Sequence, residues 1–153
     1  MLALWLLVPM AGAFVSRTQQ CKASALHAAL QPRVPTDSDD MVSAAARSVQ
    51  TALDAGVTRQ TLELHIPLPP ETSPEDLDPW PGGLPQIAEY ALPLARECLK
   101  KAVKGGSEVQ QVVLSKADGC VQLYCQGETA SDDAMLILQP GAETFDELRQ
   151  LDG

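Results

Sequence analysis

A proline-rich segment constrains the fold of this chain more than any other feature of its sequence. Residues 67–85 contain seven prolines in nineteen positions, with the run Asp78-Pro79-Trp80-Pro81-Gly82-Gly83 near the centre. Proline lacks a backbone N–H and fixes φ, so this density excludes a helix or a central strand. Loops of this length inside compact domains are usually functional or flexible. We therefore predict a long loop here, with regular elements before and after it.

Two elements are predicted before the loop. Residues 36–55 should form a helix, because apolar residues recur there with the 3.6-residue period. Thr36 is placed to cap this helix and Gly56 to end it. Residues 60–66 alternate apolar and polar side chains, which predicts a strand with one face on a core.

A second helix should follow the loop. Pro85 suits its first turn, and an apolar stripe that includes Cys98 continues to Gly105 and Gly106, which should stop it. Pro93 interrupts the stripe and predicts a kink.

Three strands and a last helix are predicted beyond it. Residues 108–116 and 120–126 read as a β-hairpin with Gly119 in the left-handed conformation. Residues 135–138 are an unbroken apolar run, which favours a strand buried on both faces. Thr144 opens a T-x-x-E capping box for a helix through residue 151.

These elements predict an α/β fold with a mixed sheet of about four strands and flanking helices. The strand 60–66, the second helix and the strand 108–116 should form a right-handed βαβ unit with parallel neighbouring strands. The chain stops after a helix that should lead to another strand. We therefore expect a domain that is incomplete at its C-terminal end and that folds poorly as residues 37–153 alone.

The first 36 residues have the composition of a two-part targeting signal. Residues 1–13 join an apolar run to Ala11-Gly12-Ala13, as in a signal peptide with its cleavage site, and the run is too short to cross about 30 Å of hydrocarbon. Residues 14–36 carry three basic and no acidic side chains, which is typical of a transit peptide. With Phe14 first, the pair resembles the plastid signals of algae with secondary plastids. The alternatives are a membrane anchor, or plain secretion with Phe14 as the mature N-terminus.

The remaining residues, 37–153, form the predicted α/β domain, and their charge excludes some partners. They carry 20 acidic and 8 basic side chains. A surface this acidic repels phosphate backbones and anionic lipid, which disfavours nucleic-acid and peripheral-membrane roles. Removal of the targeting segment would leave Cys98, Cys120 and Cys125, an odd number that suits a reducing compartment. Cys120 and Cys125 should lie on opposite faces of one strand, where they cannot form a disulfide.

No motif for catalysis or cofactor binding stands out. The sequence has neither a phosphate-binding loop nor a dinucleotide fingerprint, and the cysteines lack metal-site spacing. His65 is expected to face solvent, and Cys98 to behave as a small buried apolar residue. Three acidic pairs should be solvated surface charge: Glu75-Asp76, Asp132-Asp133 and Asp146-Glu147. We expect no catalytic residue, no cofactor and no metal.

Trp80 marks the candidate site. A large aromatic in a Pro/Gly loop either packs the loop onto the core or offers an anchor to a partner. The predicted partner-contact loop consists of Pro79, Trp80, Pro81, Gly82 and Gly83.

Four segments together resemble a known plastid family of unknown function in plants and algae, which includes low-photosystem-II-accumulation proteins. They are LELHIPLPP (62–70), DLDPWPGGLPQ (76–86), ALPL (91–94) and GAETFDEL (141–148), and the likeness spans about residues 39–153. The resemblance implies a chloroplast stromal protein, in some members tied to photosystem II assembly and in plants sometimes appended to a nucleotide kinase. It transfers no catalytic residues. It also implies that the family's domain continues with further strands, so we expect this chain to end before that domain does.

The leading functional hypothesis is a non-catalytic plastid protein that binds proteins, as an assembly or accumulation factor for a photosynthetic complex. Its partners would be a thylakoid complex or its assembly intermediates, with no nucleic acid and no membrane span in the mature protein. The alternative is a small plastid enzyme or a nucleotide-associated regulatory domain.

Overall fold

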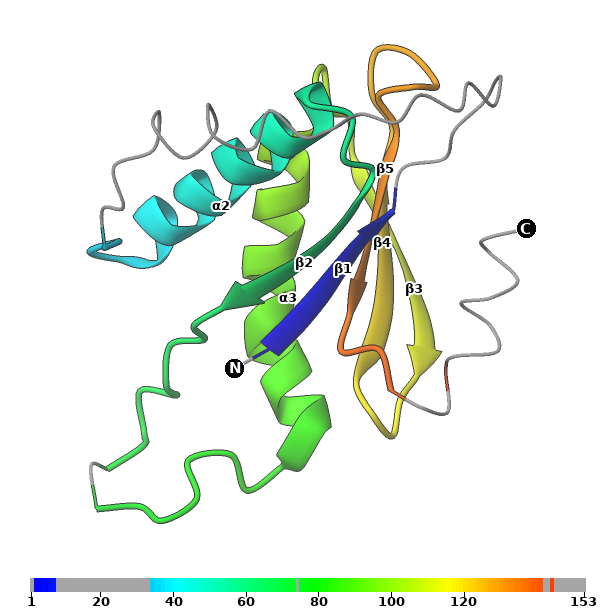
Figure 1. Cartoon of the computed structure of the whole chain (residues 1–153). Coiled ribbons are helices and arrows are strands. Elements are labelled where there is room, and N and C mark those ends of the chain that lie inside the picture. The colour runs from blue at the N-terminus through cyan, green and yellow to red at the C-terminus, as the bar shows by residue number, and fades with distance from the viewer. Residues whose placement is uncertain (1, 8–33, 74, 142–143, 145–153) are drawn as a thin grey trace.

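The computed structural model describes residues 2–7, 34–73, 75–141 and 144, and within them two helices cover one face of a five-stranded sheet (Figure 1). The strand order across the sheet is β2-β1-β5-β4-β3. The α/β fold class is confirmed, as are all four predicted strands. The elements are β1 (Leu2–Leu7), α2 (Ser38–Asp54), β2 (Arg59–Leu64), α3 (Gly83–Ala102), β3 (Val109–Ser115), β4 (Cys120–Cys125) and β5 (Ala134–Leu138).

The strand pairing corrects the prediction of a mixed sheet. Each pair in the described sheet is antiparallel. β2 and β3 do run in the same direction, but they are the two edges of the sheet and not parallel neighbours. The reason is that β4 folds back beside β3, β5 folds back beside β4, and β1 fills the place between β5 and β2. The helix α3 therefore connects one edge of the sheet to the other.

The fifth strand comes from the segment predicted to be a signal peptide. β1 lies between β2 and β5, with Leu4 opposite Leu62 on one side and opposite Leu138 on the other. Removal of residues 1–13 stays a prediction, and the chain that retains them has a continuous sheet.

The helix α2 runs from Ser38 to Asp54, within the predicted range 36–55. Its N-cap is Asp37, whose Oδ1 accepts a hydrogen bond of 2.8 Å from the backbone N–H of Asp40, so the predicted Thr36 cap is wrong. Aspartate at the N-cap reaches the third helical N–H and also opposes the positive end of the helix dipole. Gly56 follows the C-cap with φ +82°, as the sequence predicted.

The helix α3 packs through small side chains. Its buried face consists of Ala88, Ala91, Ala95, Cys98, Leu99 and Ala102. Because alanine side chains are small, the axis of α3 can lie close to the sheet. All of these residues belong to the hydrophobic core. Pro93 lies inside the helix with its ring exposed, away from that face.

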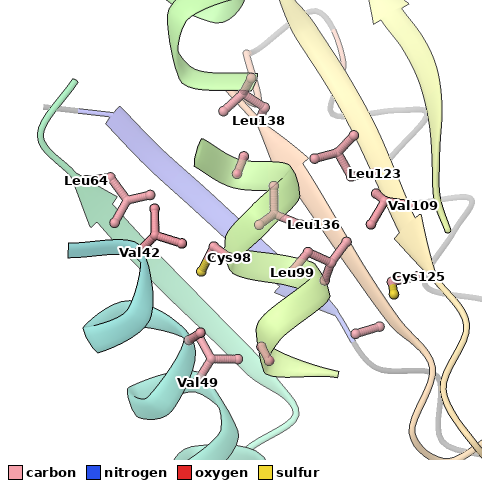
Figure 2. Close-up of a cluster of buried hydrophobic side chains, with 14 of the residues drawn as sticks. Val42, Val49, Leu64, Cys98, Leu99, Val109, Leu123, Cys125, Leu136 and Leu138 are labelled. Atoms are coloured by element: carbon pink, nitrogen blue, oxygen red, sulfur yellow. The ribbon is translucent and has the colours of Figure 1, made fainter. Parts of the chain in front are cut away.

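The core lies between the helices and the sheet (Figure 2). Val42 and Val49 reach it from α2, Cys98 and Leu99 from α3, and Leu123, Leu136 and Leu138 from the strands. Leu136, Ile137 and Leu138 have no exposed surface, although successive residues of a strand point to opposite faces. The prediction that this strand is buried on both faces is confirmed.

The β3–β4 hairpin and the cysteines also agree with the prediction. Gly119 has φ +64° in the turn between the two strands. Cys98, Cys120 and Cys125 are buried, and of these three Cys98 and Cys125 belong to the core on the helix side. The predicted last helix lies outside the described residues apart from Thr144, whose hydroxyl donates to the Gly141 carbonyl over 2.9 Å.

Candidate functional site

The candidate site is the connection between β2 and α3. Residues 65–82 form no helix or strand wherever the structure describes them, as the prolines predicted. The segment extends away from the sheet and returns to the first turn of α3 (Figure 1). Pro69 is buried within it, so part of the loop packs against the domain.

An aromatic pair fixes the loop to the helix. The rings of Trp80 and Tyr90 meet edge to face, with centroids 5.4 Å apart and planes at 70°. The Tyr90 hydroxyl donates to Glu71 Oε1 over 3.4 Å. One side chain of α3 therefore contacts both the early part of the loop, at Glu71, and its late part, at Trp80. Desolvation raises the pKa of Tyr90, and the negative charge of Glu71 raises it further. Trp80 is half-buried, so it packs the loop and still presents part of its ring to solvent.

Short hydrogen bonds shape the end of the loop. The Trp80 N–H donates to Asp78 Oδ1 over 2.9 Å, and the Gly83 N–H donates to the Trp80 carbonyl over 2.8 Å. The side chain of Gln86 accepts from the Gly82 N–H over 2.8 Å, which satisfies a donor at the start of α3. Gly83 has φ +64°, a conformation that favours glycine. The Gly82-Gly83 pair is therefore the turn that starts the helix.

A cavity of about 270 Å³ lies beneath Trp80, lined by Leu64, His65, Ile66, Trp80, Leu84, Ile87 and Gln139. Gln139 follows β5 with φ +51°. With its amide oriented to satisfy its hydrogen bonding, the side chain donates to the carbonyl oxygens of Asp118 and Leu84 over 2.9 and 3.2 Å. The cavity thus joins the loop, the start of α3 and the end of β5.

Five of the seven residues that line this cavity are apolar, and the other two contribute an imidazole and an amide, so polar and apolar atoms share its surface about equally. Its volume is just below the 300–1,000 Å³ of typical ligand sites. It can accept a small apolar group or a side chain of a partner. His65 is exposed, in agreement with its prediction as a solvent-facing residue.

The outer surface of the loop combines apolar and acidic side chains. Leu77 is fully exposed, and Leu68 and Leu84 are exposed by 57% and 50%. The segment 67–85 carries four carboxylates and no basic side chain. A second hollow of about 210 Å³ is lined by Pro69, Glu71, Thr72, Asp76, Asp78, Pro79, Pro81 and Gln86. The loop therefore suits a partner surface that is both apolar and basic.

The predicted contact residues lie together at this place. Pro81, Gly82 and Gly83 are exposed, whereas Pro79 and Trp80 are half-buried. Sequence reasoning missed Tyr90, Glu71 and Gln139. Tyr90 follows the helical period of α3 and carries no sign of a contact with the loop, and no local pattern connects Gln139 with the loop.

The other groups considered from sequence have structural roles. Asp133 accepts hydrogen bonds from the Tyr124 hydroxyl and the Gly127 N–H, which close the β4–β5 connection and lower the pKa of its carboxyl. Asp132 accepts from the Thr129 N–H over 3.2 Å. Burial raises the pKa of Cys98 to about 11, so its thiol stays protonated near neutral pH. Asp146 and Glu147 lie outside the described residues.

Two kinds of feature are absent from the described part of the chain. No group of three His, Cys, Asp or Glu side chains there could hold a metal ion. None of its helices is both long and apolar enough to cross a membrane.

Fold and site together define a two-layer α/β domain with an acidic, proline-rich connection between its first edge strand and its central helix. The family model described as Domain of unknown function (DUF1995) matches residues 35–152, and the chain belongs to this family. The predicted membership of a family of unknown function is thereby confirmed. Comparison with curated proteins and with solved structures gave no match. Strand β1 lies outside the matched residues.

Proposed function

We propose that this chain is a non-catalytic, protein-binding domain of the plastid stroma that acts as an assembly or accumulation factor for a photosynthetic complex. The observation that carries the proposal is the exposed, leucine-bearing and acidic surface of the loop. Exposed Leu77 and half-buried Trp80 supply apolar contact area, and the Trp80–Tyr90 pair holds the loop in one arrangement. A prearranged loop loses less conformational freedom when it binds than a free one.

The charge of the loop indicates the partner. Four carboxylates surround the exposed leucines, so a basic and apolar protein surface is complementary. The plastid location rests on the two-part composition of residues 1–36 and on the family resemblance. The link to a photosynthetic complex rests on the resemblance alone.

A site-specific photo-crosslinking experiment tests the binding surface. A photoreactive amino acid is placed at Leu77 in the loop or, as the control, at Val57, an exposed apolar residue outside the loop. In extracts of the source plastids, the Leu77 position should give a defined adduct whose mass spectrum identifies a subunit or assembly factor of a photosynthetic complex. Equal adducts from both positions, or none from Leu77, would reject the loop as the binding surface.

The location has its own test. A fluorescent protein that carries residues 1–36 should accumulate in plastids, with the fusion cut downstream of Phe14. A secreted fusion that starts at Phe14 would reject the plastid assignment.

The cavity beneath Trp80 supports a second candidate, a small enzyme or nucleotide-associated domain. Its imidazole and amide could orient a small ligand there. Titration with nucleotides, followed by Trp80 fluorescence, distinguishes the two. Saturable binding that His65→Ala and Gln139→Ala both weaken would favour this second function.

A further inference from the structure

The structure contains a slot for one strand in the middle of its sheet. β1 occupies it, in antiparallel register with β2 from the Leu2–Leu64 pair to the Leu7–Arg59 pair. On its other side β1 pairs with β5, from Leu4–Leu138 to Leu7–Met135. Both edges of the slot therefore supply backbone hydrogen-bonding groups to the strand between them.

The register defines the chemistry that fits the slot. On the helix-covered face, the slot is bordered by Leu62 and Leu64 of β2 and by Leu136 and Leu138 of β5. Residues directly opposite in an antiparallel pair share a face. Positions 2, 4 and 6 of the central strand are thus in register with core positions. Positions 3 and 5 are opposite the exposed residues Glu63 and Thr61 of β2, and position 5 is also opposite Ile137 of β5, which is fully buried. The slot requires an apolar residue at every second position.

Without β1 the sheet has a gap. β2 pairs with no other described strand, and β5 keeps only its pairing with β4. Exposed strand edges of this kind are templates for pairing with another chain. The occupant of the slot lies outside the family domain, which matches residues 35–152, and within the segment predicted to be removed.

We propose that the domain is a strand acceptor: after removal of residues 1–13, the slot between β2 and β5 binds an extended, apolar segment of another polypeptide, antiparallel to both edges. A second mature copy would lack Leu2–Leu7 as well and could not donate this strand, so we assign the donor to a different protein. In the uncleaved chain, β1 is the intramolecular occupant. This inference rests on the proposed function, because it requires both the cleavage and a protein partner.

The first test places β1 in the slot of the full-length chain. In a Cys21→Ser background, Trp5→Cys is combined with Thr61→Cys, which is directly opposite. The matched control combines Trp5→Cys with Glu63→Cys, two residues off register, where the diagonal separation of about 7–8 Å exceeds disulfide reach. Mild oxidation should join only the first pair. The absence of that disulfide would overturn the proposal.

The second test measures acceptance of a strand in trans. A protease site is inserted after Ala13 of the full-length chain, and the folded protein is cut so that the fragment stays bound until it exchanges. Excess fluorescent peptide with the sequence of residues 1–8 and a lysine tag is then added, and its anisotropy is followed. The peptide should bind saturably and displace the fragment, and the backbone amides of β2 should stay protected from hydrogen exchange.

Two charge-matched peptides test the register. Lysine in place of Leu4 puts a charge at a core position, whereas lysine in place of Ala3 lies opposite Glu63 at the solvent side. The Leu4→Lys peptide should bind at least about tenfold more weakly than the Ala3→Lys peptide. Equal affinities, or no binding of any peptide by the cut protein, would overturn the strand-acceptor proposal. A failure of the peptides to bind would not change the crosslinks from Leu77, which test the loop. The strand-acceptor proposal can therefore be rejected while the proposed function stands.

Discussion

The two halves of the sheet are built in different ways. β3, β4 and β5 follow one another in the chain, and each pairs with its neighbour in sequence. Among the described strands β2 pairs with β1 alone, and β1 comes from the far N-terminal end of the chain. The first half is local and lies entirely within the family domain, while the second half depends on a strand from outside it.

Burial differs in the same way. β4 and β5 each place several fully buried side chains in the sheet, whereas β2 alternates exposed and half-buried residues and buries only Leu64. The buried side chains of the hairpin half come mainly from β4 and β5, since β3 buries only Val109. β2 depends on β1 for its backbone hydrogen bonds within the sheet. We therefore expect the half that contains β2 to be the less stable one.

Removal of the N-terminal strand should have the largest effect. Residues 37–153 alone should lose the cooperative transition, because β2 is left without a sheet partner and β5 with one open edge. The loss should consume most of the roughly 5–15 kcal/mol typical of a domain. A thermal melt of the near-ultraviolet signal measures it, and the β1 peptide should restore the transition. A monomeric protein that melts in one step above about 55 °C without the peptide would show that β1 is dispensable.

Core truncations compare the halves directly. Leu123→Ala in β4 should lower the free energy of unfolding by about 2–5 kcal/mol, because Leu123 has no exposed surface. Leu62→Ala in β2 should cost only about 1 kcal/mol, since Leu62 is half-buried. Urea denaturation of the full-length variants provides both values. Equal losses would contradict the division of the sheet into a strong and a weak half.

A pair of glycine substitutions sharpens the comparison. Gly119 and Gly56 both have positive φ, so alanine costs about 1–2 kcal/mol at either one. A Cβ at Gly119 would lie 2.7 Å from the Ala88 Cβ and 2.8 Å from the Leu84 carbonyl oxygen, whereas nothing lies within 4 Å at Gly56. Gly119→Ala should therefore be less stable than Gly56→Ala by about 1–3 kcal/mol. Identical melting temperatures would show that the turn at Gly119 can move away from α3 without loss of stability.

The smallest expected effect concerns the β4–β5 connection in acid. The Tyr124 hydroxyl holds the pKa of Asp133 below its ordinary value of 3.8, so its contribution to stability is present above that pH. It is lost as the pH falls through the lowered pKa of the folded state. Tyr124→Phe should reduce stability slightly at neutral pH and flatten its dependence on pH in the acid range. Parallel urea titrations at pH 3 and pH 6 compare it with the parent, and an unchanged pH dependence would count against this contact.

Local patterns predicted most of the elements. The periodicity of α2 and α3, the Gly119 turn and the apolar run in β5 each depend on interactions within a few residues. The capping residue of α2 was misplaced by one position, because Thr36 and Asp37 are both good caps and only the backbone geometry selects between them.

The pairing of strands that are far apart in the chain could not be predicted from the sequence. The Leu2–Leu7 run suits a buried strand as well as a signal peptide, and its strand role depends on partners that are far away in the sequence. The same holds for the site. Proline density identified the loop, but the cavity beneath it depends on Gln139, which tertiary packing alone brings there.

The pairing of β1 with β5 also has a consequence for the order of events during synthesis. Leu7 and its partner Met135 are 128 residues apart, so β1 leaves the ribosome long before its second edge exists. At roughly 5–20 residues per second, that interval lasts about 6–26 s. Throughout it the apolar N-terminal segment has no completed slot to enter and is accessible to targeting factors. Because β5 is synthesised late, export has the first opportunity to use the Leu2–Leu7 segment, before the sheet can include it as a strand.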